Sequence, residues 1–399
     1  MSQIINTNVM SLNAQRNLAA SNNDLSTAIQ RLSSGLRINS AKDDAAGLAI
    51  SERFTTQIRG LEVAVRNAND GISLAQTAEG AMVELSNNLQ RIRELAVQSS
   101  NATNSDSDRK ALQAEVSQLV EEISRVATQT NFNNINLLDG SFTGAQFQVG
   151  ANAGQTIAIA GILNANANAL GATSFKTLEI DASDVSTITH VGTADPFGYA
   201  AVGDVTISIA GKDIAIPSMP ASASAGTTDA EAVAAGEKAY AALMASAINA
   251  KSSETNVIAE AVDGKVKLTQ IVGNEAIEVK KGNTAVTGTA ETASKVVKDF
   301  DITSFAGAQM AIQIADTALE AINGARADLG AIQNRFSSTI ANLTTTSENL
   351  SASRSRIQDT DYAAETAELT RTQILQQAGT AMLAQANSIP NNVLSLLQQ

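Results

Sequence analysis

Residues that could do chemistry are few in this sequence. It contains one histidine, His190, and no cysteine. A lone histidine cannot supply the several nitrogen ligands of a zinc site or the paired histidines of the HExxH motif. Without cysteine the chain has no disulfide, thiol nucleophile or thiolate ligand. These counts exclude the common histidine- and cysteine-based sites, and His190 is predicted to be an ordinary surface or loop residue.

Two pairs of adjacent acidic residues, Asp43–Asp44 and Glu121–Glu122, come nearest to a carboxylate site. Adjacent positions point to different sides of a helix, so the carboxylates of each pair do not converge on one substrate. The glycine-rich nucleotide-binding motifs and the GxSxG nucleophile motif are also absent from the sequence. We therefore expect no catalytic residue, no metal site and no cofactor, and we predict that the protein is not an enzyme.

The charge and composition limit the partners of the chain. The net charge is −13 and no cluster of basic residues stands out, so nucleic-acid binding has little electrostatic support. No apolar run approaches the length of a membrane span, and Met1–Ile4 lacks the pattern of a cleaved signal peptide. We expect an acidic protein without membrane insertion, either cytoplasmic or exported by a route that does not cleave a signal.

Both ends of the chain have the pattern of amphipathic helices with a narrow apolar face. In the first segment several large apolar residues follow spacings of four and three, and in the last segment they recur every seven residues. Neither face has a neighbour in sequence to cover it, so we expect the two ends to pair and to fold fully only on assembly with other copies. The predicted assembly residues are Ile5, Val9, Leu12, Leu25, Ile29, Leu32, Leu36, Leu375, Met382 and Ile389.

The segment that follows the first helix is predicted to be a helical hairpin. Glycine and polar residues at 33–39 interrupt the first helix, and Ser40–Asp43 resembles a capping box. Apolar residues then recur at helical spacing from Leu61 to Ala96, and again from Leu112 to Val126 after a polar break at 99–106.

The middle of the chain has a different pattern. Short alternating segments bounded by glycine predict small β-hairpins between Phe147 and Gly161. Asp204–Ile216 and Val257–Thr269 each predict a strand pair, the second around the turn signal Asp263–Gly264, and Asp229–Ala250 predicts a helix. Residues 172–302 are therefore predicted to form a separate α+β insertion.

A heptad seam runs from Gln309 onward and predicts a coiled-coil helix of about 45 residues that ends near Asp359. The predicted fold is mainly α at both ends, with paired terminal helices, a helical coiled-coil rod carrying a small β-hairpin, and an α+β outer insertion domain. The predicted layers are residues 1–42 with 360–399, residues 43–171 with 303–359, and residues 172–302.

Several long runs resemble bacterial flagellin, in the same order along the chain and with no match in the middle. They are Ile5–Asn8, Leu32–Ile50, Leu89–Gln98, Leu329–Phe336, Ser353–Ile357 and Gln373–Asn387. The resemblance implies a homopolymer, the extracellular flagellar filament used for swimming, whose subunits leave the cell through the flagellar type III apparatus. It also implies an export chaperone, cap and hook-junction proteins as partners.

The resemblance further implies recognition by innate immune sensors of a host. Arg91, Leu95, Glu115 and Leu319 match positions that contact a Toll-like receptor on the surface of the rod. Leu95 and Leu319 could equally pack against neighbouring chains. Leu394, Leu396 and Leu397 match the leucines recognised by NAIP-type sensors. The everyday role of these leucines would be core packing and, before export, chaperone binding.

Two other protein classes fit parts of the pattern. A hook–filament junction protein would share the terminal helices, and a type III tip or adhesin protein would need paired termini on a coiled-coil stalk. The density of matches at both ends favours the filament subunit. An enzyme carried in residues 172–302 is the third class, and no catalytic constellation there supports it.

Overall fold

A computed structural model describes residues 7–397, apart from 186–189, 192–196, 200, 202, 204, 210–211, 227, 272–276, 278, 282–283 and 287. The chain divides into two compact units. One comprises Met1–Asp70, Phe147–Ile157 and Arg335–Gln399, and the other comprises Gly71–Gln146 and Ala158–Asn334. These boundaries fall within two long helices, α2 (Ala45–Ser99) and α7 (Phe305–Gln358), so they differ from the predicted layers, which stay a prediction.

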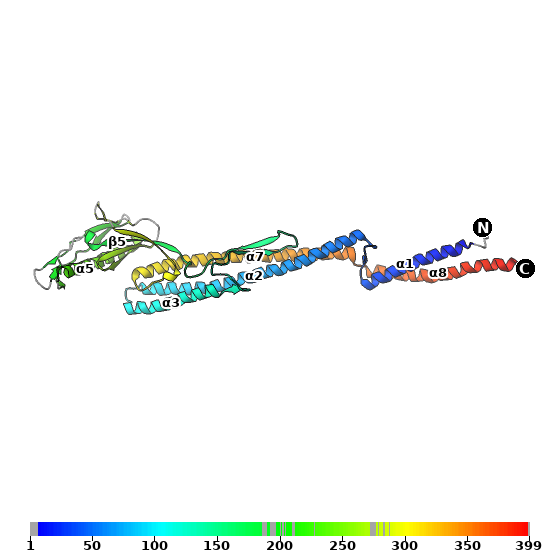
Figure 1. Cartoon of the computed structure of the whole chain (residues 1–399), viewed down its shortest axis with the longest axis horizontal. Helices are drawn as coiled ribbons and strands as arrows, with labels where there is room; N and C mark the ends of the chain where they lie inside the picture. The colour runs from blue at the N-terminus through cyan, green and yellow to red at the C-terminus, as the bar shows by residue number, and fades with distance from the viewer. Residues whose placement is uncertain are drawn as a thin grey trace. The chain divides into compact units, whose positions relative to one another are not determined.

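In the first unit the two terminal helices pair, as predicted. Helix α1 (Val9–Ser34) and helix α8 (Tyr362–Leu397) lie side by side (Figure 1). Hydrogen bonds join Asn8 to Ala386 near the ends and Ser21 to Thr372 further along, so the two helices run antiparallel.

The connectors that follow α1 and precede α8 are also paired. Helix α1 ends at Gly35, whose φ of 72° is the left-handed conformation that glycine adopts without strain. Leu36 then forms an antiparallel bridge with Asp359. The Arg37 guanidinium donates to the carbonyl of Ile357 at 2.6 Å, which satisfies a free carbonyl in the last turn of α7.

The predicted capping box at Ser40–Asp43 is wrong. Asp43 accepts hydrogen bonds from the backbone of Asn39 and Ser40 and from the Ser40 hydroxyl, so these residues form a turn. Those hydrogen bonds, the Ser40 backbone N–H first, lower the pKa of the Asp43 carboxyl. Helix α2 begins at Ala45, and the side chain that accepts from its first turn is Asp44, from the Gly47 N–H at 2.8 Å.

The structure has β-hairpin conformation where the sequence predicts it, but the hairpin begins before Phe147. One hairpin forms there, from β3 (Gly144–Gln148) and β4 (Thr156–Ala160). Within the first unit, Phe147 packs edge-on against the buried Phe336 of α7, with ring centroids 5.7 Å apart. The Asn67 side chain of α2 donates to the Gln148 carbonyl at 3.0 Å, so the hairpin is fastened to both helices.

In the second unit the predicted helical hairpin is present. Helix α2 ends at Ser99, and α3 (Asp106–Gln129) begins after Ser105, which forms a capping box with Asp108. A tight turn, with Asn133 and Asn134 at positive φ, then joins the short strands β1 (Asn131–Phe132) and β2 (Ile135–Asn136).

The heptad seam of α7 is confirmed, and the helix is longer than predicted. It spans 54 residues because it begins at Phe305, four positions before the first residue of the predicted seam. In the second unit, polar and charged side chains join α2 to α7. Gln333 donates to Glu79 at 2.8 Å, and Arg93 pairs with Asp316 at 2.6 Å. These polar pairs fix which residues of the two helices lie opposite each other.

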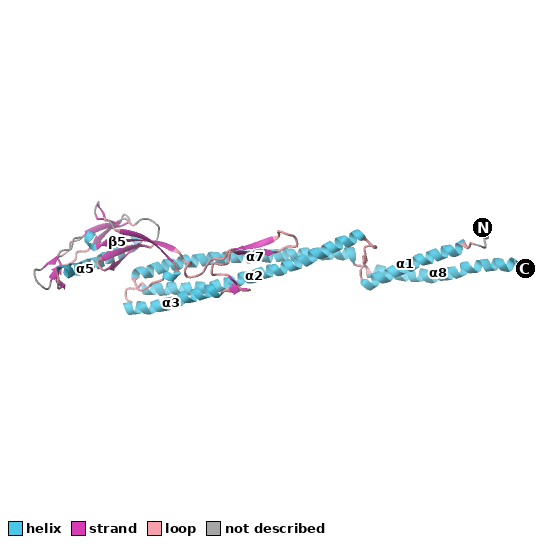
Figure 2. Cartoon of the chain, viewed as in Figure 1, coloured by secondary structure: helices cyan, strands magenta, loops and turns pink. Residues whose placement is uncertain are grey.

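The predicted α+β insertion is also present in the second unit (Figure 2). Both predicted strand pairs form, and Asp263 and Gly264 have the positive φ values of a two-residue hairpin turn. The sheet orders are β11-β12-β5-β15, β14-β13-β8-β9 and β10-β7-β6. Helix α5 (Asp229–Asn249) packs its buried Tyr240, Met244 and Ile248 into the core of these sheets.

The remaining elements of the insertion are short. The strands are β5 (Thr173–Asp181), β6 (His190–Val191), β7 (Phe197–Tyr199), β8 (Val205–Ile209), β9 (Lys212–Ile216), β10 (Ser222–Gly226), β11 (Val257–Val262), β12 (Lys265–Gln270), β13 (Val279–Lys281), β14 (Thr284–Ala285) and β15 (Thr289–Lys295). The helices are α4 (Ala182–Val185), α6 (Ser252–Thr255) and the 3₁₀ turn Val297–Asp299. His190 begins a strand, and its side chain lies outside the described residues.

Candidate functional site: the paired terminal helices

Polar side chains tie the two terminal helices together. Asn8 caps α1 by accepting from the Ser11 N–H, while its own amide donates to the Ala386 carbonyl at 2.8 Å. The Ser11 hydroxyl donates to Asn387 at 2.7 Å. Further along the pair, Gln376 donates to Asn22 at 2.9 Å. This spacing of polar contacts sets the register of α1 against α8.

The residues buried between α1 and α8 are small. They are Ser11, Ser21, Ala28, Thr372 and Ala386. Small side chains allow two helix backbones to approach closely and remove little apolar surface from water. The contact therefore aligns the two helices without covering their large apolar residues.

Five of the eight predicted assembly residues whose side chains the structure describes are exposed in the single chain. The exposed fractions of Val9, Leu12, Ile29, Leu375 and Met382 are 63, 57, 51, 46 and 65%. Leu25, Leu32 and Leu36 are half-buried. Ile5 and the side chain of Ile389 lie outside the described residues. Pairing of the chain's own ends therefore covers Leu25, Leu32 and Leu36 only in part and leaves Val9, Leu12 and Ile29 open.

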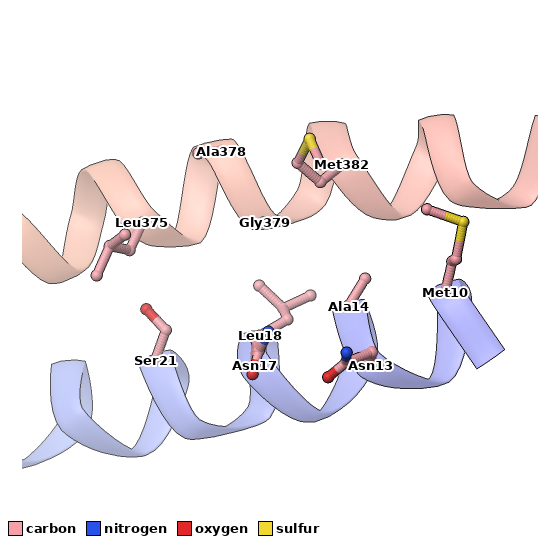
Figure 3. A pocket seen from close by; sticks show the side chains of 10 residues that line it. All are labelled: Met10, Asn13, Ala14, Asn17, Leu18, Ser21, Leu375, Ala378, Gly379 and Met382. Carbon is pink, nitrogen blue, oxygen red and sulfur yellow. The ribbon is translucent and has the colours of Figure 1, made fainter.

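A groove of about 540 Å³ lies between the helices (Figure 3). It is lined by Met10, Asn13, Ala14, Asn17, Leu18, Ser21, Leu375, Ala378, Gly379 and Met382. A Cβ atom at Gly379 would lie 3.1 Å from the Leu18 side chain, so glycine leaves room for that leucine. The sequence patterns missed most of this groove, and a glycine at position 379 inside an otherwise helical run was the available signal.

The groove is suited to apolar contact. Its α8 wall consists of Leu375, Ala378, Gly379 and Met382, which offer no titratable group. Among the described residues, no group of three or more acidic or histidine side chains is placed to hold a metal ion. No described helix combines the length and apolarity needed to cross a membrane. Burying another apolar helix against this surface is the interaction that its side chains favour.

The predicted receptor residues lie on the helices of the second unit. Arg91 on α2 pairs with Glu115 on α3 at 2.8 Å and with Glu94 at 3.1 Å, and all three side chains are exposed. The hydrogen bond to Glu115 is the main reason that the pKa of Arg91 is raised, so this charge is permanent. The structure therefore brings Arg91 and Glu115 into one exposed charged cluster.

The other residues suggested by resemblance are placed differently. Leu95 is 1% exposed, so its side chain forms no part of the surface in the single chain. Leu319 on α7 is half-buried. The side chains of Leu394, Leu396 and Leu397 lie outside the described residues.

Sequence comparison identifies the family of this chain. Residues 5–143 match the bacterial flagellin N-terminal helical region, and residues 312–397 match the bacterial flagellin C-terminal helical region. B-type flagellin of Pseudomonas aeruginosa is 42% identical, and the alignment covers all of both chains. The chain belongs to the bacterial flagellin family. Polar flagellin C of Vibrio parahaemolyticus, 43% identical over all of both chains, and flagellin A of Vibrio cholerae, 44% identical over 99% of both, agree with this assignment.

A flagellin is a structural subunit of the flagellar filament, so the junction-protein alternative has less support. A solved structure of FliC from Burkholderia pseudomallei is 28% identical and covers 66% of this chain and 99% of its own, with a TM-score of 0.38. Because that TM-score is below 0.5, the family assignment rests on the sequence comparisons.

Proposed function

We propose that this flagellin polymerises through its terminal helix pair, and that α1 and α8 of each subunit bury their apolar faces against the same helices of other copies. The observation that carries the proposal is that the paired helices α1 and α8 expose large apolar residues, such as Leu12 and Ile29, beside an apolar groove. A contact between different faces of identical subunits does not close on itself and generates a helical filament.

We assign residues 1–42 and 360–399 to the filament core, 43–171 and 303–359 to the surrounding rod layer, and 172–302 to the outer surface. Three features support the assignment: the α1–α8 pairing, the long helices α2 and α7, and the separate sheets of the insertion. The filament would drive swimming, and its subunits would have no enzymatic role. The folding of α1 and α8 on assembly stays a prediction.

We infer the export route and the other partners from what the family resemblance implies. The subunit would leave the cell through the flagellar type III apparatus without a cleaved signal, bound beforehand by an export chaperone, and would assemble beside cap and hook-junction proteins. The filament would be extracellular. A host Toll-like receptor would bind the exposed Arg91–Glu115 cluster and Leu319, and the buried Leu95 would contact it only if the surrounding packing changed. NAIP-type sensors would bind Leu394, Leu396 and Leu397.

Electron microscopy of two purified proteins tests the polymerisation proposal. One is the full chain, and the other lacks residues 1–36 and 362–399. We expect filaments from the full chain after seeding and none from the truncated chain. Circular dichroism controls for folding, because the truncated chain should retain the strong helical signal of α2, α3 and α7. Filaments from both proteins would refute a role for the termini, and filaments from neither would favour a junction or tip protein.

A further inference from the structure

Two methionines share the groove between the terminal helices. Met10 lies on α1 and Met382 on α8, and both line the groove (Figure 3). Their exposed fractions are 60 and 65%. Met82 and Met244 are fully buried, Met219 is nearly so, and Met310 is half-buried. The most exposed methionines of the described residues therefore lie together, at the surface through which assembly is proposed to occur.

The thioether of methionine is open to two-electron oxidants at such positions. With a peroxide, the sulfur lone pair attacks one oxygen, an S–O bond forms as the O–O bond breaks, and water leaves once the second oxygen is protonated. The sulfur is oxidised and the peroxide is reduced. Because susceptibility follows exposure, Met10 and Met382 should react well before Met82 and Met244.

We propose that Met10 and Met382 form an oxidation site that controls assembly of the free subunit. This inference rests on the proposed function, because it requires another copy to cover the groove. A sulfoxide is polar, and the α8 wall around Met382 offers only Leu375, Ala378 and Gly379. The polar side chains of the groove, Asn13, Asn17 and Ser21, lie on the α1 wall. A neighbouring apolar helix that covers the groove removes the sulfoxide oxygens from water and supplies no donor in its place, which opposes association.

Assembly should in turn protect both residues. Once a neighbouring helix covers the groove, the two sulfur atoms lose their contact with dissolved oxidant. The free subunit should therefore be sensitive to oxidation at these two methionines, and the assembled filament should resist the same oxidant. A reductase specific for methionine sulfoxide should restore assembly, because sulfoxide formation is reversible.

The test compares the wild-type chain with the variant Met10→Leu/Met382→Leu. Leucine has a similar volume and keeps the groove apolar, but it cannot be oxidised. Free subunits are treated with dilute hydrogen peroxide, peptide mass spectrometry measures each methionine, and seeded assembly gives the critical concentration. Met82 and Met244 are internal controls that should stay unmodified, and Met310 is present in both proteins.

We expect oxidation to raise the critical concentration of the wild type by about tenfold or more, as a buried unpaired polar group should. The oxidised variant should assemble at the same critical concentration as the same variant left untreated, and wild-type filaments should keep Met10 and Met382 unmodified. Equal assembly of oxidised and untreated wild type would overturn the inference. So would equal loss in the variant, or equal oxidation of both methionines in filaments and free subunits, although the proposed function would survive these three results. If neither untreated protein assembles with seeds, the proposed function fails and the inference fails with it.

Discussion

At the scale of single residues, Gly35 ends the first terminal helix and begins its connector. Its left-handed backbone is costly for any residue with a Cβ atom, and a Cβ there would lie 2.9 Å from the Tyr362 hydroxyl. The Gly35 N–H also donates to the Arg31 carbonyl at 2.8 Å, which closes the last turn of α1. One glycine thus stops α1 and leaves space for the start of α8.

Replacing Gly35 with alanine should weaken the assembled terminal pair. We expect a cost of about 1–2 kcal/mol per subunit from the backbone conformation alone. The measurement is the temperature at which filaments dissociate, which should fall. Gly35→Ala in a Tyr362→Phe background separates the two causes, because it removes the hydroxyl contact and leaves the backbone strain. An unchanged dissociation temperature in both backgrounds would show that the left-handed cap is unimportant.

Arg91 is the residue on which the proposed receptor contact most depends. Arginine is frequent among residues that dominate binding energy, and the loss of such a residue costs about 1.4 kcal/mol or more, which is roughly a tenfold loss of affinity. We expect Arg91→Ala to raise the half-maximal dose in a Toll-like receptor reporter assay by about that factor. Arg125→Ala is the matched control, because Arg125 is also exposed and paired with a glutamate, Glu122. Equal effects of the two substitutions would contradict a specific role for Arg91.

At the scale of elements, the pairing of α2 with α7 depends on polar contacts within an apolar seam. Gln333 and Glu79 are partly buried and hydrogen-bonded to each other, so replacing one of them leaves the other without its hydrogen-bond partner. We expect Gln333→Leu to lower the free energy of unfolding of the monomer by about 1–2 kcal/mol, measured in urea. Glu79→Leu/Gln333→Leu should recover most of that loss, because neither polar group is then left unpaired. Additive losses in the double variant would show that the two residues are not coupled.

The sequence patterns predicted most elements but not how their faces pair. Helix ends at Ser99 and Asp106 and the hairpin at Asp263–Gly264 depend on local turn and cap chemistry, which the sequence contains directly. The sequence does not distinguish the Ser40–Asp43 turn from a helix cap, because serine and aspartate side chains accept or donate the same kinds of hydrogen bond in both structures. The direction of the α1 stripe could not be predicted, because periodicity shows that a helix has an apolar face and not which neighbour covers it.

The same limit applies to the candidate site. Val9, Leu12, Ile29 and Met382 were predicted as assembly residues from their spacing, and their exposure in the single chain is what a surface for other copies requires. The groove itself depends on Leu18 fitting over Gly379, a contact between distant parts of the chain. Burial of Leu95 likewise depends on packing with other helices, which a motif match does not reveal.

At the scale of the whole molecule, the chain presents an aligned pair of helices whose contact buries small residues and leaves several large apolar residues exposed, among them Leu12, Ile29 and Met382. For a single chain in water such exposure is unfavourable, and association with other copies would relieve it. Assembly should therefore depend on the exposed stripe more than on any residue buried between α1 and α8.

The most direct test of this account is the critical concentration for seeded assembly of a variant in which Leu12, Ile29 and Met382 are replaced by serine. Each removes apolar surface worth roughly 1.5 kcal/mol or more when fully buried, so the critical concentration should rise by at least about a hundredfold. Val262→Ser/Ile135→Ser, at exposed positions outside the terminal helices, is the control and should leave assembly unchanged. Assembly of the stripe variant at the wild-type concentration would contradict the central claim that the exposed stripe drives polymerisation.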